Sequence, residues 1–147
     1  MKAVLQRVNS CSITVKGEIV STIDKGILLF VGITNDDEYK DADKLVEKIT
    51  KIGIFEDDNG KISLNIREEK GEIMIVSQIT LIANLRKGKK PDFSKSASSK
   101  DAKHMYEYII ERFKSIGIKT SNGIFGEYME ISLENDGPVT YILDTRI

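Results

Sequence analysis

The sequence predicts an α+β fold, in which a curved, barrel-like and mostly antiparallel sheet carries two main helices. Short apolar runs typical of strands dominate the first third of the 147-residue chain and are separated by tight polar or glycine-containing breaks. Only two segments show the apolar spacing of an amphipathic helix. Strands and helices do not alternate regularly, which argues against an all-parallel α/β fold.

The composition is that of one compact domain spanning residues 1–147. The chain is 40% hydrophobic and 31% charged, a mix that supports a sizeable core. No apolar run reaches the roughly 18 residues needed to cross a bilayer, and no signal peptide is visible, so we expect a cytoplasmic protein without membrane contact. The only cysteine, Cys11, shares a strand face with Ile13 and Val15, so we expect it to be buried.

The N-terminal strands are expected at residues 3–8, 12–15, 18–23 and 26–33. The stretch 27–31 has no polar face, which predicts a central strand buried on both sides. Alternation places Arg7 on the same face as Ala3 and Leu5. A guanidinium that points inward needs carboxylate or carbonyl partners, because an unpaired buried charge is costly.

The first helix is expected over residues 38–51, where the spacing of apolar side chains becomes helical. Its apolar positions are Ala42, Leu45, Val46 and Ile49, and its candidate N-caps are Asn35, Asp36 and Asp37. The second helix begins after Ser98 or Ser99 and ends near Gly117. Its apolar face consists of Ala102, Met105, Tyr106, Ile109, Phe113 and Ile116.

The remaining strands are expected at residues 61–66, 72–78, 128–133 and 139–143. The last two flank Asn135-Asp136-Gly137-Pro138-Val139-Thr140, an unusual way to enter a terminal strand because proline lacks a backbone donor and glycine permits unusual dihedrals. One interpretation is a tight turn into an edge strand. The other is a rigid backbone element that presents carbonyl oxygens to a ligand.

Few side chains suggest conventional catalysis or metal binding. The only histidine, His104, lies beside the apolar face of the second helix, where a solvated position is expected. Histidines and cysteines do not occur at zinc-ligand spacing, and the acidic turn at residues 57–60 lacks the later glutamate of a calcium loop. No phosphate-binding glycine pattern follows a strand. We therefore expect neither a metal nor a cofactor.

Two polar features remain. The strand over residues 72–78 runs into Ser77-Gln78-Ile79-Thr80-Leu81, whose polar groups either line a pocket or satisfy nearby backbone groups. The net charge of −1 argues against a generally basic nucleic-acid binder. Five cations nevertheless cluster within ten residues, and on composition alone they predict a solvated loop: Arg86, Lys87, Lys89, Lys90 and Lys95.

These motifs resemble a known family. Ser77-Gln78-Ile79-Thr80-Leu81 resembles the SQxTL motif, and Asn135 to Thr140 resembles the NxGPVT motif, of the D-aminoacyl-tRNA deacylases. The opening Gln6-Arg7-Val8 and the segment Pro91-Asp92-Phe93-Ser94-Lys95 agree as well, so the resemblance spans essentially the whole chain. Two motifs at the expected separation make it specific.

The resemblance implies an enzyme that hydrolyses the ester between a D-amino acid and the 3′-terminal adenosine of tRNA, with glycyl-tRNA also accepted. It implies a cytoplasmic homodimer with sites at the subunit interface, where Gly137-Pro138 with a cis bond enters the pocket of the partner. Its carbonyls would hold the substrate α-ammonium, so that an L side chain meets rigid backbone while a D side chain projects into open space. Arg7 would hold this element through its carbonyls.

Further roles follow from the same resemblance. Ser77, Gln78 and Thr80 would position the ester and stabilise the oxyanion, while the ribose 2′-hydroxyl assists an attacking water, since Thr80 has no histidine base. Phe125 would pack on the terminal adenine and Met129 would form a pocket wall, although plain core packing is the alternative for both. The basic cluster would then contact the tRNA backbone.

Two positions depart from the family pattern: Ile79 stands where phenylalanine is more common, and Lys90 where arginine precedes the proline. Ile79 changes the shape of the pocket edge, and Lys90 loses bidentate phosphate geometry. Two alternative functions remain open. One is a noncatalytic module that binds aminoacylated tRNA, and the other resembles the relative that removes L-alanine from threonine tRNA and has a trans Gly-Pro bond.

Overall fold

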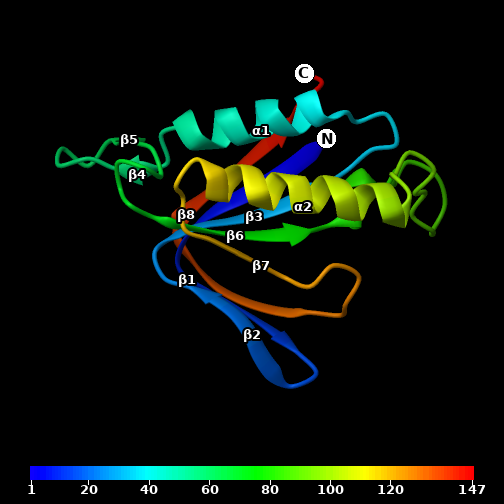
Figure 1. Cartoon of the computed structure of the whole chain (residues 1–147), viewed down its shortest axis with the longest axis horizontal. Coiled ribbons are helices and arrows are strands. Elements are labelled where there is room, and N and C mark those ends of the chain that lie inside the picture. Colours follow the sequence, from blue (N-terminus) through cyan, green and yellow to red (C-terminus); the bar gives the residue numbers. More distant parts are fainter.

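The structure is a computed structural model of residues 1–147, in which a strongly curved sheet carries two helices on one of its faces (Figure 1). This confirms the predicted α+β class. No helix is both long and apolar enough to span a membrane. The elements in chain order are β1 (Lys2–Val15), β2 (Glu18–Ile23), β3 (Gly26–Gly32), α1 (Tyr39–Lys51), β4 (Phe55–Glu56), β5 (Ile62–Leu64), β6 (Glu72–Ser77), the 3₁₀ helix η1 (Ile79–Ile82), α2 (Ser99–Ser115), β7 (Thr120–Asn122) and β8 (Glu130–Asp144).

Strand β1 organises the main sheet. Its first half pairs with β3, its second half with β2 and nearly its whole length with β8, all antiparallel. In contrast, β3 pairs with β6, and β6 with β7, in parallel. The sheet is therefore mixed. The two parallel pairs were not predicted from the sequence, and α1 and α2 lie in the crossover connections that such pairs require.

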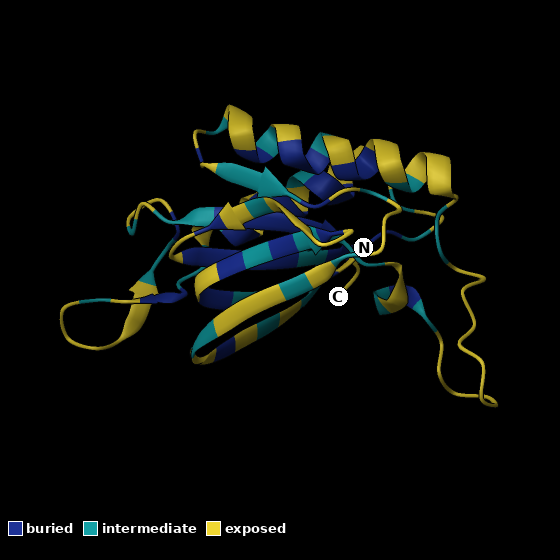
Figure 2. Ribbon diagram, turned by 90° about the horizontal axis from the view of Figure 1, so that it is seen from below, coloured by how far each residue is buried: buried dark blue, intermediate teal, exposed yellow.

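The core lies on both faces of the sheet. The larger cluster packs between the sheet and the two helices, and the smaller one fills the concave face. Strand β3 contributes Ile27 and Leu29 to the first cluster and Leu28 to the second, which confirms the prediction of a strand buried on both sides. Figure 2 shows buried residues along the strands of the sheet, whereas the projecting loops are mostly exposed. Cys11 lies in the smaller cluster and is 3% exposed, also as predicted.

Two predictions of paired short strands were wrong, because each pair is one continuous strand. β1 runs through the polar break at Asn9 and Ser10, and β8 runs through the Gly-Pro element. The two strands pair with each other, and register shifts in β1 between Gln6 and Val8 and between Val8 and Ser10 absorb both interruptions. The strand predicted at residues 61–66 is shorter and forms a separate two-stranded sheet with β4.

The predicted N-cap of the first helix was also wrong. Glu38 is the capping residue, and its N–H donates to the Asp41 carboxylate at 2.8 Å. Asp37 instead accepts from the Thr34 N–H at 2.7 Å and lies 3.2 Å from the Arg146 guanidinium, so it fixes the turn after β3. For α2 the prediction was right: the Ser98 hydroxyl accepts from the Asp101 N–H.

Candidate functional site

A hollow of about 320 Å³ opens where β6 ends beside the β7–β8 loop. It contains five of the residues singled out in the sequence. Ser77, Gln78 and Ile79 form one wall, and Phe125 and Met129 form the opposite wall. The remaining lining comes from the turn after β3, the start of α2 and the same loop: Ile33, Ala97, Ser99, Ala102, Gly126 and Glu127. Residues distant in the sequence therefore meet in one pocket.

The first wall is held rigidly to β3. The Gln78 N–H donates to the Val31 carbonyl at 2.8 Å, after which the chain turns into η1. The close approach requires Gly32, because a Cβ there would lie 2.9 Å from the Leu81 Cβ and 3.0 Å from the Gln78 carbonyl oxygen. The Gln78 side-chain amide donates to the Thr80 hydroxyl. Gln78 and Thr80 therefore form one polar unit at the pocket edge.

Thr80 does not line the hollow itself, and it is exposed on η1 next to Ile79. Ile79 is 53% exposed, although its side chain also lines the hollow. His104 is exposed, as predicted, and lies in a neighbouring hollow that shares only Ile33 and Ala97 with the first. A histidine base is therefore not among the residues that line the candidate site.

The opposite wall is an irregular loop between β7 and β8. Phe125 is half-buried against the large core cluster, and Met129 packs against the small one. The Met129 sulfur lies over Gly123, since a Cβ on that glycine would come within 2.6 Å of it. Both side chains therefore contribute to core packing, which was the alternative role predicted for them. Each also lines the hollow.

Arg7 points inward and is 4% exposed, as predicted. Its Nε donates to the Asp136 carbonyl at 2.9 Å and its Nη1 donates to the Ile54 carbonyl at 2.9 Å. The Asp136 carboxylate lies 3.2 Å from Nε, which balances the buried charge. The expected contact needs one correction: the carbonyl that Arg7 holds belongs to Asp136, the residue before Gly137.

The Gly137–Pro138 bond is cis, as the family resemblance implied. The element lies in a bulge of β8 between Asn135 and Thr140, which pair with Val8 and Gln6, and no residue of β1 pairs with Gly137 or Pro138. Gly137 has φ +141°, and a Cβ there would lie 2.8 Å from the Val139 Cγ2 atom. Only glycine fits this position without strain.

The residues that close this bulge were not predicted from the sequence. The Asn135 carboxamide accepts from the Val139 N–H at 2.8 Å and donates to the Thr140 hydroxyl at 3.1 Å. The Gln6 side chain donates to the same hydroxyl at 3.2 Å. Their position on either side of Gly-Pro in the motif was the available signal, because such short polar side chains commonly close backbone turns.

Within one chain the Gly-Pro element and the hollow lie apart. Arg7 pairs with Ile27 at one end of β3, whereas Ser77 pairs with Val31 near the other end. Four residues of strand separate these positions, about 13 Å. Strands β1 and β3 also lie between β8 and β6. The structure therefore brings together the pocket residues but does not bring Gly137, Pro138 and Arg7 to them.

Four of the five predicted cations lie in a projecting loop, residues 84–92, which we call the basic finger, and Lys95 follows it (Figure 1). Backbone hydrogen bonds between Asn84 and Asp92 close its base. Its four cations and Lys95 are exposed and form no salt bridge. Hydrogen bonds from the Ser94 N–H and hydroxyl hold the pKa of Asp92 below its usual value.

The segment after the finger is joined to the turn after β3. The Asn35 N–H donates to the Lys95 carbonyl at 2.9 Å, and the Ala97 N–H donates to the Ile33 carbonyl at 3.0 Å. Ile33 and Ala97 line the hollow. The segment that leaves the finger therefore continues directly into the lining of the hollow.

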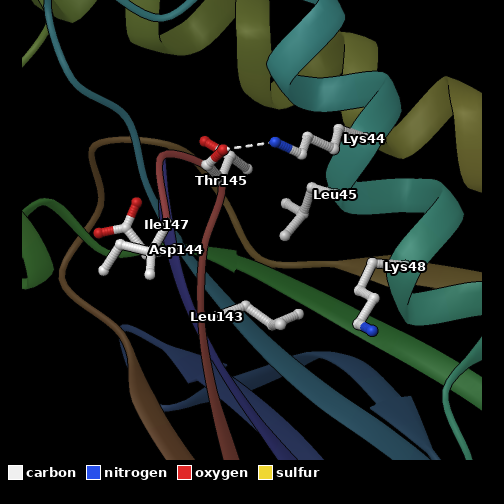
Figure 3. A pocket seen from close by; sticks show the side chains of 7 residues that line it. All are labelled: Lys44, Leu45, Lys48, Leu143, Asp144, Thr145 and Ile147. Carbon is white, nitrogen blue, oxygen red and sulfur yellow. Dashed lines mark hydrogen bonds between the residues drawn. The ribbon is translucent and has the colours of Figure 1, made fainter.

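A different hollow of about 250 Å³ lies between α1 and the end of β8 (Figure 3). Its lining includes Lys44 and Lys48 of α1 and Leu143 of β8, and Lys44 donates to the Thr145 carbonyl at 2.8 Å. None of the residues predicted to act in function lines it. The hollow beside Ser77 is therefore the candidate functional site.

Known proteins resemble this chain over nearly its whole length. A family model described as D-Tyr-tRNA(Tyr) deacylase matches residues 4–144. The D-aminoacyl-tRNA deacylases of Thermosipho melanesiensis and Aquifex aeolicus are 47% and 43% identical to this chain over 99% of its length, and the matches cover 98% and 99% of those proteins.

Solved structures show the same fold. The c-Myc DNA Unwinding Element Binding Protein superposes with a TM-score of 0.93 at 39% identity, covering 98% of each chain. A probable eukaryotic D-amino acid tRNA deacylase superposes with a TM-score of 0.85 at 15% identity, covering 97% of each chain, which shows the shared fold. On the match to the family model and to the full-length relatives, the chain is a hydrolase of the D-Tyr-tRNA(Tyr) deacylase family.

Proposed function

We propose that this protein hydrolyses the ester bond of D-aminoacyl-tRNA and releases the free D-amino acid and reusable tRNA. The observation that carries the proposal is the convergence of Ser77, Gln78 and Ile79 with Phe125 and Met129 around one hollow. One wall is polar and suits an ester, while the other is aromatic and apolar and suits an adenine. We place this activity in the cytoplasm and assign it to residues 1–147 acting as one domain.

The chemistry that we propose uses water and the RNA. Gln78 and Thr80 form a hydrogen-bonded polar unit at the pocket edge, suited to positioning the ester and stabilising a developing oxyanion. Since the lining contains no histidine to activate Thr80, a nucleophilic threonine lacks a base. The ribose 2′-hydroxyl of the terminal adenosine would instead assist the attacking water.

Selection against L-amino acids is assigned to Gly137 and Pro138. Their carbonyls would accept hydrogen bonds from the substrate α-ammonium, so that the side chain of an L-residue meets backbone, a D side chain points to solvent and glycine meets no obstacle. Glycyl-tRNA is therefore a second expected substrate. The support is the rigid mounting of the element, which Arg7 and Asn135 fix from both sides of the bulge.

The separation between this element and the hollow leads us to propose a homodimer with crossed sites. Strand β8 pairs only with β1, so its other edge is free, and Ile142 on it is 80% exposed. An open edge with apolar side chains is suited to covering by another chain. In the proposed dimer the Gly137–Pro138 bulge of one subunit enters the Ser77 hollow of its partner.

The basic finger would contact the phosphates near the acceptor end of the tRNA. Its cations form no salt bridge, and the segment that follows it reaches the hollow at Ala97, which is hydrogen-bonded to Ile33. Phosphate contacts of this kind contribute affinity that falls steeply with salt. The finger therefore supplies binding energy, while the hollow recognises the terminal nucleotide and its amino acid.

The test compares D-tyrosyl-tRNA, L-tyrosyl-tRNA and glycyl-tRNA labelled at the 3′-terminal nucleotide. We expect rapid loss of the D-ester, slower but measurable loss of the glycyl ester and no loss of the L-ester beyond that in buffer. Binding of D-tyrosyl-tRNA without accelerated hydrolysis would identify a noncatalytic module. Equal loss of the D- and L-esters would refute the proposed selection.

Complementation tests the crossed sites separately. Co-expressing a Gln78→Ala chain with a Gly137→Ala chain yields mixed dimers in which one of two sites combines an intact hollow with an intact bulge. If the subunits assort randomly, about a quarter of all sites regain full activity. Each variant alone stays inactive. If the activity of the mixed dimers never exceeds that of either variant alone, both parts of the site lie in one subunit or the protein is not a dimer.

A further inference from the structure

Strands β6 and β7 diverge at the base of the hollow. They pair in parallel up to Ile75 of β6 and Asn122 of β7. Beyond this point β6 continues to Ser77, whereas the segment after β7 turns away at Gly123. The Gly123 N–H donates to the Ile75 carbonyl at 3.1 Å, and the Asn122 side chain donates to the Gly123 carbonyl at 2.7 Å. The width of the hollow is set at this fork, because its two walls begin there.

A tyrosine from α2 occupies the fork. Tyr106 is 3% exposed, and its hydroxyl lies 2.7 Å from the Ile75 carbonyl oxygen and 3.4 Å from the Gly123 carbonyl oxygen. Its ring packs on Phe125 with a centroid separation of 5.9 Å and an angle of 40° between the planes. One side chain therefore touches the strand that leads to Ser77, the start of the opposite loop and the aromatic residue on that loop.

We infer that Tyr106 is a positioning residue for the deacylation site: it holds the loop wall with Phe125 at the correct distance and angle from the wall with Ser77 and Gln78. This inference rests on the proposed function of the hollow. Tyr106 does not line the hollow and touches no substrate, so it acts through Phe125 and Gly123. Aromatic pairs of this offset, tilted kind constrain each other's orientation.

The hydroxyl can be removed without leaving a carbonyl unpaired. The Ile75 carbonyl keeps the hydrogen bond from Gly123, and the Gly123 carbonyl keeps the one from Asn122. Tyr106→Phe also keeps the buried ring. The variant should therefore fold while losing the direct link between the two walls, which separates a positioning effect from a collapse of the core.

The matched control is Tyr108→Phe. Tyr108 lies on the same helix and its hydroxyl donates to the Asp43 carboxylate at 2.7 Å, a contact outside the hollow. With D-tyrosyl-tRNA we expect Tyr106→Phe to raise KM about tenfold and to change kcat less than threefold, while Tyr108→Phe changes neither. If Tyr106→Phe behaves like its control, the inference is wrong.

A double variant tests whether the effect passes through Phe125. If it does, adding Tyr106→Phe to Phe125→Ala lowers kcat/KM less than twofold, although the same change costs about tenfold in the native protein. If the two changes instead reduce kcat/KM independently, so that their effects multiply, Tyr106 does not act through Phe125 and the inference is wrong.

A third measurement does not depend on activity, so it separates this inference from the proposed function. The chain contains no tryptophan, so Phe125→Trp introduces a single fluorophore at the loop wall. Adding Tyr106→Phe should shift its emission to the red and increase quenching by acrylamide at unchanged secondary structure, whereas Tyr108→Phe should leave both as they were. An unchanged spectrum would contradict the inference even if the enzyme proved inactive toward every ester tested.

Discussion

Arg7 donates a hydrogen bond from Nε to the carbonyl oxygen of Asp136, at 2.9 Å, from a position that is almost fully buried. The contact joins the middle of β1 to the residue before Gly137, so that a charged side chain supports the bulge from inside the fold. Burying a guanidinium is costly unless hydrogen-bond acceptors surround it in fixed positions. Here the acceptors are the Asp136 and Ile54 carbonyls and the Asp136 carboxylate.

Arg7→Lys should reduce both stability and activity. A lysine ammonium cannot reach both carbonyls in the geometry of the guanidinium, so one buried acceptor loses its donor at a cost of about 1–3 kcal/mol. We expect kcat/KM for D-tyrosyl-tRNA to fall more than tenfold. The control is Arg112→Lys, since Arg112 forms a half-exposed pair with Asp43. Denaturant unfolding and deacylation assays check both, and equal behaviour of the two variants would contradict the role of Arg7.

Asn135→Ala should open the bulge without changing its glycine or proline. The Val139 N–H loses its acceptor, and the Thr140 hydroxyl loses a donor. We expect a loss of about 1–3 kcal/mol in the free energy of unfolding and a larger proportional loss of discrimination between D- and L-esters. Asn9→Ala is the control, because the Asn9 amide bonds to Glu134 at the surface. Discrimination that survives in Asn135→Ala would show that the bulge needs no such support.

Removing the 2′-hydroxyl of the terminal adenosine should slow hydrolysis more than removing the hydroxyl of Thr80. If the ribose assists the attacking water, D-tyrosyl-tRNA ending in 2′-deoxyadenosine should react at least a hundredfold more slowly, whereas Thr80→Ala should retain measurable activity. Single-turnover assays at saturating enzyme separate chemistry from binding. An undiminished rate with the deoxy substrate would exclude the RNA-assisted reaction. Complete loss in Thr80→Ala with binding intact would make Thr80 the nucleophile.

Neutralising three lysines of the basic finger should weaken binding of tRNA but leave the chemistry intact. For the Lys87→Gln, Lys89→Gln, Lys90→Gln variant we expect KM to rise at least tenfold at low salt and the slope of log KM against log salt to decrease by about two to three, since each lost phosphate contact lowers it by slightly less than one. The control neutralises three exposed lysines elsewhere: Lys48, Lys61 and Lys70. Equal effects in both variants would show that only net charge matters.

Cys11 should make the fold sensitive to alkaline pH. Burial raises the pKa of its thiol to about 11, above the usual value of 9.0 that applies when the chain is unfolded. Between these values the unfolded thiol ionises while the folded thiol stays protonated, so the unfolded state binds fewer protons and stability falls as pH rises. Cys11→Ala should lower the Tm at pH 8, and the difference from the native protein should shrink toward pH 11. A constant difference would contradict this origin.

The sequence was sufficient for features that depend on local pattern or on a single side chain. An uninterrupted apolar run identified the buried central strand, helical spacing identified both helices, and period-two alternation identified the buried side of Cys11, because burial of apolar side chains follows these patterns directly. The inward direction of Arg7 followed from the same alternation. The two polar motifs indicated a chemistry only through their resemblance to the D-aminoacyl-tRNA deacylase family.

Pairing and proximity were decided only by the tertiary structure. Parallel pairing of β6 with β3 and β7 depends on where two crossover helices pack, and continuous pairing of β1 with β8 depends on bulges that absorb local breaks, so neither is encoded in any short window. The same holds for the site. Phe125 faces Ser77 across the hollow because β6 and the segment after β7 diverge at the fork that Tyr106 bridges. Gly137 stands apart from them because two strands of the sheet intervene. Short sequence patterns determine which groups can do the chemistry, but long-range packing determines which of them meet.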